Sequence, residues 1–418
     1  MSWYRYALIV GVLALAAAGA VALYSRTPAE VRAAVPPPDA TDPVHGARFG
    51  EEQIARHAAF RAPSYLAFLF AALLPIAAVL LLARGPFSAL ARRAEALPGG
   101  WPVHAAVLAL AITVLLAVVA LPLQYVRGFA MQQAWGLSTQ DSAAWFLDQA
   151  RGLLVAGVIA IVSAVAFFGV VRAAPRTWWL WGWGTFSLLT VLLVFLYPVA
   201  IAPLFNRFTP LEDPSLVARI KAYGEAVGVP IDEVQVSDAS KRTTAENAYV
   251  AGLGATKRMV LYDTLVESNP EDEIAFVAAH ELGHRAENHV VKGVLISSLG
   301  LLAGFAALYL LARSGALWRW GGAPGVADVR ALPLLLAFLL VSTLVLLPLE
   351  NALSRRFESR ADAIALELTG DPDPAVRAFR GLAFKNIADL DPPGPIVWTL
   401  FTHPPIPERI RSFLSAPP

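Results

Sequence analysis

The chain has 418 residues, of which 57% are hydrophobic and only 16% are charged, with a formal net charge of +1 and no cysteine. Soluble domains carry about 25% charged residues, so the composition excludes a disordered chain, a nucleic-acid binder and an ordinary cytosolic enzyme, and predicts a membrane protein with a sizeable polar part. The absence of cysteine excludes disulfides, a catalytic thiolate and a cysteine-bound metal.

Seven apolar segments are long enough to cross the hydrocarbon core of a bilayer, which takes about 20 helical residues. They are Tyr6–Tyr24, Pro63–Ala83, Trp101–Leu121, Gly152–Val171, Trp178–Ile201, Val291–Ala312 and Ala331–Leu349. An alternative interpretation of the first segment is a cleaved signal peptide with Arg5 in its basic region. We favour a retained helix, because its apolar run is long for a signal peptide.

The connections between these segments differ in length. Those after the first, third, fifth and seventh segments are long and hold nearly all the acidic residues, so seven spans place them on one side of the membrane. Two of them are predicted as long loops at residues 26–62 and 122–151. Lysine and arginine are spread almost evenly between the two sides, so the positive-inside rule does not decide which side is cytoplasmic.

The chain is divided into an N-terminal membrane domain at residues 1–205 and a second domain at 206–418. Short β-rich runs separated by glycine-containing turns predict a small sheet within 234–263. A helix is predicted at 270–288, where proline and acidic residues open an amphipathic pattern. It precedes the spans at 291–312 and 331–349, a charged helix at 351–370 and further C-terminal helices. The expected fold is therefore mainly α and polytopic, with a small sheet.

The helix at 270–288 contains the sequence His280-Glu281-Leu282-Gly283-His284. Histidines at i and i+4 lie on the same face of a helix and can share one tetrahedral Zn²⁺ ion. Glu281 can then reach a metal-bound water and take its proton. A chance match on a surface helix is the alternative, and the amphipathic context of the motif weakens it.

A catalytic zinc needs a third protein ligand, and the helix at 351–370 offers one. Glu358 is the candidate ligand, and Asp362 lies one turn further along the same face, where it can hydrogen-bond a ligating histidine. This order of motifs is that of the gluzincin metallopeptidases. The alternative is a solvated charged helix, which fits Arg355 and Arg356 better than Glu358.

Two rival metal schemes fit less well. A metzincin places its third histidine ten residues after the first, whereas His289 follows His280 by nine residues and the intervening glycine is missing. We therefore expect His289 to be an interfacial or capping residue. An intramembrane protease carries its motif within a span, but acidic residues and Arg285 flank this motif, which places it just outside the hydrocarbon.

Two further segments are candidates for contacts with a peptide. Asn247, Ala248 and Tyr249 are predicted to belong to an edge strand to which an extended peptide can add, although a turn asparagine is a common alternative. His403, held by the prolines that follow it, is placed to hydrogen-bond an oxyanion. A purely structural histidine is an equally good interpretation of the sequence there.

With these motifs the sequence resembles the integral-membrane type I CaaX prenyl endopeptidase family. The resemblance runs from about residue 49 to 407. It is carried by Gly136–Gln140, Ile201–Leu211, Asn247–Tyr249, Arg258–Leu265, His280–His284, Arg356–Asp362 and His403-Pro404. One departure is the pair Gln132 and Gln133, where many members carry an acidic residue, and this affects the expected polarity of the cavity wall.

The resemblance implies seven helices that form a barrel around a water-filled chamber, closed at one end by a zincin-like peptidase domain. It implies that His280, His284 and Glu358 bind one Zn²⁺ per chain, that Glu281 is the general base, and that Asn247 and His403 contact the substrate or the transition state. The expected partners are a peptide or membrane-protein substrate and the lipid bilayer, with no nucleic acid.

The expected function is hydrolysis of peptide bonds in a multi-pass protein of a bacterial plasma membrane, with the peptidase face cytoplasmic. Two alternatives stay open at this point. In the first, the protein is a membrane chamber or transporter with a vestigial peptidase site. In the second, it is a metalloprotease that its helices merely anchor in the membrane.

Overall fold

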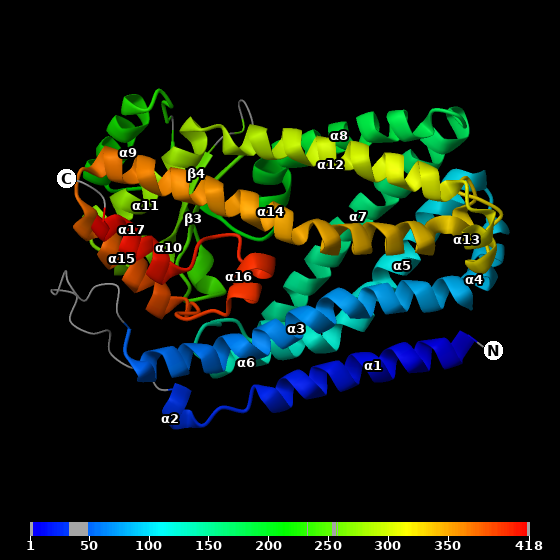
Figure 1. Ribbon diagram of the computed structural model, residues 1–418, viewed down its shortest axis with the longest axis horizontal. Helices are drawn as coiled ribbons and strands as arrows, with labels where there is room; N and C mark the ends of the chain where they lie inside the picture. Colours follow the sequence, from blue (N-terminus) through cyan, green and yellow to red (C-terminus); the bar gives the residue numbers. More distant parts are fainter. Residues whose placement is uncertain (1–2, 33–48, 232, 253–255, 257, 416–418) are drawn as a thin grey trace.

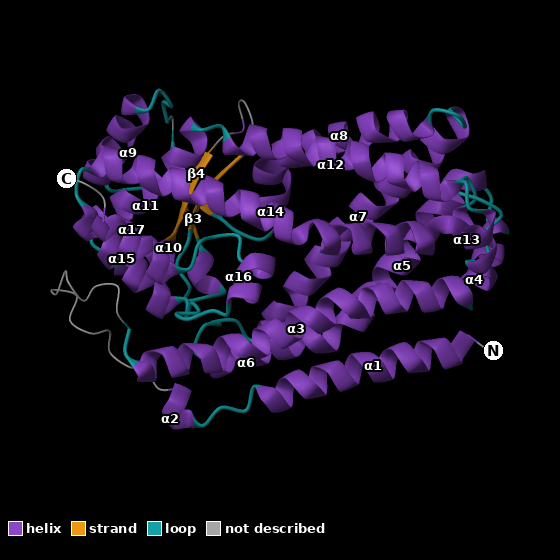
Figure 2. Ribbon diagram, viewed as in Figure 1, coloured by secondary structure: helices purple, strands orange, loops and turns teal. Residues whose placement is uncertain are grey.

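The computed structural model describes residues 3–32, 49–231, 233–252, 256 and 258–415. Long helices run along the long axis of the molecule, and a small sheet with several shorter helices lies at one end (Figure 1). The strands are confined to that end (Figure 2). The chain is therefore mainly helical, as predicted.

Among the described residues, six helices are long and apolar enough to cross a membrane. They contain α3 (Glu51–Arg84), α5 (Gly100–Tyr125), α7 (Ser142–Ala173), α8 (Trp178–Leu196), α12 (His289–Ala312) and α14 (Leu332–Thr369). The first predicted span is α1 (Trp3–Tyr24), whose stretch Ile9–Tyr24 is apolar but shorter. It packs against α3 and α5 through a buried cluster that includes Val21 and Ala67.

The described parts of the two predicted long loops are mostly helical, which corrects the sequence interpretation. Helix α3 begins at Glu51, after the short α2 (Ala29–Arg32); residues 33–48 of that loop lie outside the described residues. In the second loop, α5 continues through a π-helical turn (Val126–Ala130) into α6 (Met131–Ala134), and α7 begins at Ser142. Asp141 caps α7 by accepting a hydrogen bond from the N–H of Ala144 at 2.7 Å. Polar capping and helix propensity thus extend the spans beyond the apolar segments that hydropathy detects.

The end of the bundle opposite the sheet is closed by two short helices (Figure 1). These are α4 (Phe87–Glu95) and α13 (Gly315–Trp320). Trp318 is buried there, and its ring N–H donates to the carbonyl of Ala312 at 2.9 Å. A buried indole thus has its polar group satisfied at the end of α12.

The sheet has four strands in the order β1-β2-β4-β3. They are β1 (Phe208–Pro210), β2 (Val234–Ser237), β3 (Ala248–Ala251) and β4 (Arg258–Tyr262). Strands β2 and β4 are parallel, and the outer pairs are antiparallel. Three of these strands lie within 234–263, where the small sheet was predicted, whereas β1 is too short to be detected from the sequence. The order leaves β3 at an edge.

Two helices build the core of this end, α9 (Pro214–Ala226) and α11 (Glu271–Ala286). Apolar residues from both pack with the sheet residues Met259 and Leu261 in one buried cluster. The short α10 (Asp263–Ser268) connects β4 to α11, and α15 (Pro372–Lys385), α16 (Gly394–Leu400) and α17 (Ile406–Ser415) follow α14. The division of the chain at residue 205 stays a prediction.

Helix α14 continues without a break from the membrane bundle to the sheet end of the molecule (Figure 1), through Pro348. It packs against α11 at Gly283, where an added Cβ atom would lie 2.9 Å from the Cα atom of Ala361. Only glycine allows such a close approach. The glycine of the His280–His284 motif therefore brings the two helices close enough for their polar side chains to meet.

Candidate metal centre and active site

The side chains of His280, His284 and Glu358 converge between α11 and α14. The Nε2 atoms of the two histidines are 3.1 Å apart. Each histidine also approaches one oxygen of Glu358, at 3.2 Å from His280 Nε2 and 3.2 Å from His284 Nε2. Residues from two helices thus present two nitrogens and one carboxylate to a single point.

This geometry fits a tetrahedral metal ion. Ligand atoms at 2.0–2.1 Å from such an ion lie about 3.3 Å from each other, which is close to the separations here. The Glu358 oxygen near His280, Oε2, is buried, and the 3.2 Å contact with His280 Nε2 does not have the geometry of a hydrogen bond. A buried oxygen of this kind is costly in free energy unless it is paired. A bound cation would give it a partner and remove this cost. The three residues therefore fit a metal site.

A buried ion pair supports His280 from behind. The Nδ1 atom of His280 lies 2.9 Å from Oδ1 of Asp362, a residue one helical turn beyond Glu358 on α14. Arg409 of α17 binds Asp362 through two hydrogen bonds, at 2.8 and 2.5 Å, and its guanidinium lies 4.1 Å from the ring centroid of Phe379. Asp362 thus fixes the orientation of the imidazole, and Arg409 fixes Asp362.

A third histidine supports His284. His289, the first residue of α12, is buried, and its Nδ1 lies 2.9 Å from His284 Nδ1. Its ring stacks on Phe357, with the ring centroids 4.2 Å apart. The expectation of an interfacial or capping role missed this contact, because the spacing of residues does not show that the chain turns back at Asn288 with a φ of 53°.

Glu281 faces the edge strand β3. Burial raises the pKa of its carboxyl group, and the backbone N–H of Val250 donates a hydrogen bond to it. Two opposing effects act on the pKa of His280. Burial lowers this pKa, but the carboxylates of Asp362 and Glu358 more than offset the effect of burial and raise the pKa to about 9. The site therefore favours either a proton or a metal cation between its carboxylates.

The alternation of β3 decides which of its peptide groups face the site. The N–H of Tyr262 on β4 donates to the carbonyl of Asn247 at 3.0 Å, so Asn247 and Tyr249 turn their backbone groups toward β4. Successive residues of a strand alternate in direction. Ala248 and Val250 therefore direct their backbone groups to the free edge, on the side of Glu281.

His403 also lies beside the three converging residues. Its Nε2 is 3.3 Å from Glu358 Oε1, and its Nδ1 is 2.8 Å from the hydroxyl of Thr402. Desolvation by the surrounding residues lowers the pKa of its imidazole, although the side chain is 56% exposed. A neutral imidazole in this position can donate one hydrogen bond to a ligand.

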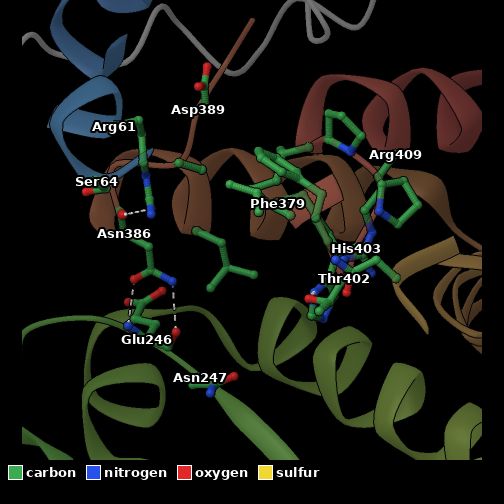
Figure 3. A pocket seen from close by; sticks show the side chains of 18 of the residues that line it. Arg61, Ser64, Glu246, Asn247, Phe379, Asn386, Asp389, Thr402, His403 and Arg409 are labelled. Carbon is green, nitrogen blue, oxygen red and sulfur yellow. Dashed lines mark hydrogen bonds between the residues drawn. The ribbon is translucent and has the colours of Figure 1, made fainter. Parts of the chain in front are cut away.

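A cavity of about 530 Å³ opens beside this cluster. Its wall includes His280, Glu281 and His403 together with Asn247 and Ala248, whereas Tyr249 does not line it and packs on Tyr262 instead. Figure 3 shows residues of this wall contributed by several elements, among them Arg61 of α3 and Asn386, which follows α15.

The glutamines Gln132 and Gln133 do not line this cavity. Gln132 donates to the backbone carbonyl of Arg127, and Gln133 donates to that of Gln140. The charged side chains on the cavity wall include Arg61 and Arg127 from the membrane helices. The departure noted in the sequence therefore does not reach this part of the cavity.

The sequence matches known families over most of its length. Residues 52–207 match the model described as CAAX prenyl protease N-terminal, five membrane helices, and residues 210–416 match Peptidase family M48. An uncharacterized metalloprotease, YhfN, of Bacillus subtilis is 34% identical over 72% of this chain and 71% of its own. CAAX prenyl protease 1 of Saccharomyces cerevisiae is 33% identical over 70% of this chain and 68% of its own.

The fold is also similar to a solved structure. The crystal structure of Ste24p from S. mikatae superposes with a TM-score of 0.74 and 25% sequence identity, and the match covers 98% of both chains. The sequence families, the curated relatives and the architecture agree with one another. The chain therefore belongs to peptidase family M48, as a multi-pass membrane metallopeptidase of the CAAX prenyl protease type.

Proposed function

We propose that this protein is a zinc endopeptidase in which His280, His284 and Glu358 hold the metal and Glu281 is the general base. The observation that carries the proposal is the convergence of two imidazole nitrogens and one carboxylate beside a second, half-buried carboxylate, that of Glu281. Two histidines and a glutamate are a ligand set typical of catalytic zinc, which keeps a fourth position open for water. When bound, the ion would lower the pKa of a water molecule and polarise the scissile carbonyl.

Glu281 then moves the protons of the reaction. Its carboxylate accepts a proton from the attacking water and later donates it to the nitrogen of the leaving amine. The hydrogen bond from Val250 holds the carboxylate in place, and burial raises its pKa toward neutral pH, which suits a group that must both take and return a proton. His403 donates a hydrogen bond to the oxygen of the carbonyl under attack.

The free edge of β3 is the proposed peptide-binding surface. The outward carbonyls of Ala248 and Val250 can accept hydrogen bonds from an extended substrate, while their N–H groups donate to Asn247 and Glu281. The side chain of Asn247 lies at the start of this edge and accepts a hydrogen bond from the N–H of Ala248 at 2.9 Å. Asn247 is thus proposed to contact the substrate backbone, and Tyr249 supports the strand through its packing on Tyr262.

The proposed substrates are peptides and segments of membrane proteins, because membrane helices contribute to the cavity wall beside the metal centre. We place the protein in a bacterial plasma membrane with its peptidase end in the cytoplasm. A transporter-like chamber with a vestigial site is disfavoured, since a site without function has no reason to keep the ligands, Glu281 and the Asp362–Arg409 pair together.

The test compares purified Glu281→Gln with the wild-type protein. We expect Glu281→Gln to keep one zinc per chain by elemental analysis and to lose hydrolysis of a quenched fluorescent peptide by about 10²–10⁴-fold or more. Glu358→Ala should lose bound zinc as well. Glu287→Gln is the matched control, because Glu287 directly follows the same helix and pairs only with surface Lys292 and Arg360 in the described structure. Full activity in Glu281→Gln would overturn the mechanism.

A further inference from the structure

The free edge of β3 ends at a side chain from another part of the chain. The carboxamide of Asn386 makes two hydrogen bonds to the backbone of Glu246, two residues before Ala248 (Figure 3). The N–H of Glu246 donates to Asn386 Oδ1 at 2.9 Å, and Asn386 Nδ2 donates to the carbonyl of Glu246 at 2.9 Å.

These two bonds occupy a pairing position on the same edge. Glu246 precedes β3 by two residues, and the hydrogen bond from the Tyr262 N–H to the carbonyl of Asn247 extends the strand pairing as far as its neighbour Asn247. Backbone groups along a strand alternate between its two sides, so continuing this alternation by one residue turns Glu246 to the side of Ala248 and Val250. A carboxamide that bonds both the N–H and the carbonyl of one residue replaces the residue of a neighbouring strand. An added peptide can therefore donate hydrogen bonds to the outward carbonyls of Val250 and Ala248, whereas both backbone groups of Glu246 already bond Asn386.

The segment that carries Asn386 is firmly held. Arg61 of the membrane helix α3 donates to the carbonyl of Asn386 at 2.8 Å and to that of Ile387 at 2.6 Å. Ile387 has a φ of 46°, a backbone conformation that β-branched residues rarely adopt. Its side chain is buried with Phe60 and Met131, which explains why this conformation persists.

We propose that Asn386 is a specificity-determining residue that closes the substrate edge of β3 and so limits how many substrate residues pair on one side of the scissile bond. Glu281 bonds Val250, and Asn386 bonds Glu246, four residues earlier, which is about 13 Å along a strand. The edge between them accommodates about four substrate residues. This inference rests on the proposed peptidase function and on binding of substrates at β3.

The test measures kcat/KM for quenched peptides that are lengthened one residue at a time, first on one side of the scissile bond and then on the other. For the wild type, we expect kcat/KM to rise by about two- to tenfold with each added hydrogen-bonding residue. On one side the rise should stop after about four residues. In Asn386→Ala, which frees the backbone of Glu246, the rise should continue for about two more residues.

Two further variants separate this role from a structural one. The double substitution Glu246→Gln with Lys385→Met neutralises the adjacent ion pair, whose Lys385 otherwise binds the Glu246 carboxylate. It leaves the backbone clamp intact, so the wild-type length limit should persist. Asn386→Asp keeps the acceptor for the Glu246 N–H and loses the donor to its carbonyl, and should show a smaller extension if Asn386→Ala does not fold.

Each outcome is decisive. A wild-type protein that cleaves none of the peptides removes the proposed function itself. Cleavage with no length limit on either side, or the same limit in the wild type and in the Asn386 variants, overturns the role of Asn386 and leaves the hydrolase assignment standing. Extension of the limit in the Asn386 variants alone supports it, and mass spectrometry of the products gives the cleaved bond in every case.

Discussion

Replacement of Arg409 by methionine tests the electrostatic design of the metal centre. Arg409, Asp362 and Glu358 are 6%, 5% and 5% exposed, so their charges are almost completely removed from water. In protein without metal, the two carboxylates are balanced by Arg409 and by His280, whose pKa is raised to about 9. Arg409→Met would leave one uncompensated buried negative charge, and such a change costs about 3–5 kcal/mol.

Bound zinc changes this balance. The ion brings two positive charges and requires neutral His280, so the metal with Glu358 and Asp362 is already neutral when Arg409 is absent. The loss of stability in Arg409→Met should therefore be much smaller in the zinc-loaded protein than in the chelated protein. The variant should also gain more in thermal stability from added zinc than the wild type does.

The assay is thermal unfolding of the purified protein in detergent, followed by tryptophan fluorescence at one heating rate, with zinc or with a chelator. Arg360→Met is the control, because Arg360 lies on α14, between Glu358 and Asp362, but in an exposed ion pair with Glu287 at 2.9 Å, and we expect no measurable change in Tm. Equal losses of Tm in Arg409→Met with and without zinc would refute the reasoning.

Three further predictions concern the same centre. Treatment with 1,10-phenanthroline should abolish hydrolysis, and added zinc should restore it; activity that persists after the metal is shown to be removed would exclude a metal-dependent step. His289→Ala should lower zinc affinity by about 10–100-fold, because His284 loses the partner that orients its ring, and titration with a competing chelator measures this. Because burial raises the pKa of Glu281, and the base must be ionised, kcat/KM should fall on acidification at a higher pH than an ordinary glutamate, with a pKa of about 4.3, would give; an acidic decline at or below the pH of an ordinary glutamate would contradict this.

The sequence was most informative where a pattern is local. Apolar runs of about 20 residues predicted the membrane helices, and the strands at Val234–Ser237, Ala248–Ala251 and Arg258–Tyr262 were found close to their observed bounds. The helix containing His280 and His284 was likewise found, because both histidines lie one turn apart. Hydropathy gave the wrong ends for α3 and α7, since their polar turns lie outside the apolar runs.

The supporting residues depend on contacts that no local pattern encodes. Arg409 is 129 residues from His280 in the chain. The sequence around Arg409 would suit a surface helix equally well, so it does not reveal that Arg409 has a buried partner. Asn386 meets Glu246 across 140 positions of the chain. Each of these contacts depends on how helices and loops pack, which is a property of the whole fold.

The sequence by itself thus determined the number of apolar segments, the small sheet and the two helical motifs that supply the candidate ligands, because helical and strand periodicities place neighbouring side chains on a common face. The tertiary structure alone decided that these motifs meet, through the close approach of α11 and α14 at Gly283. It also decided which side chains stand behind the ligands and where the edge of β3 ends, because burial and long-range packing select those partners.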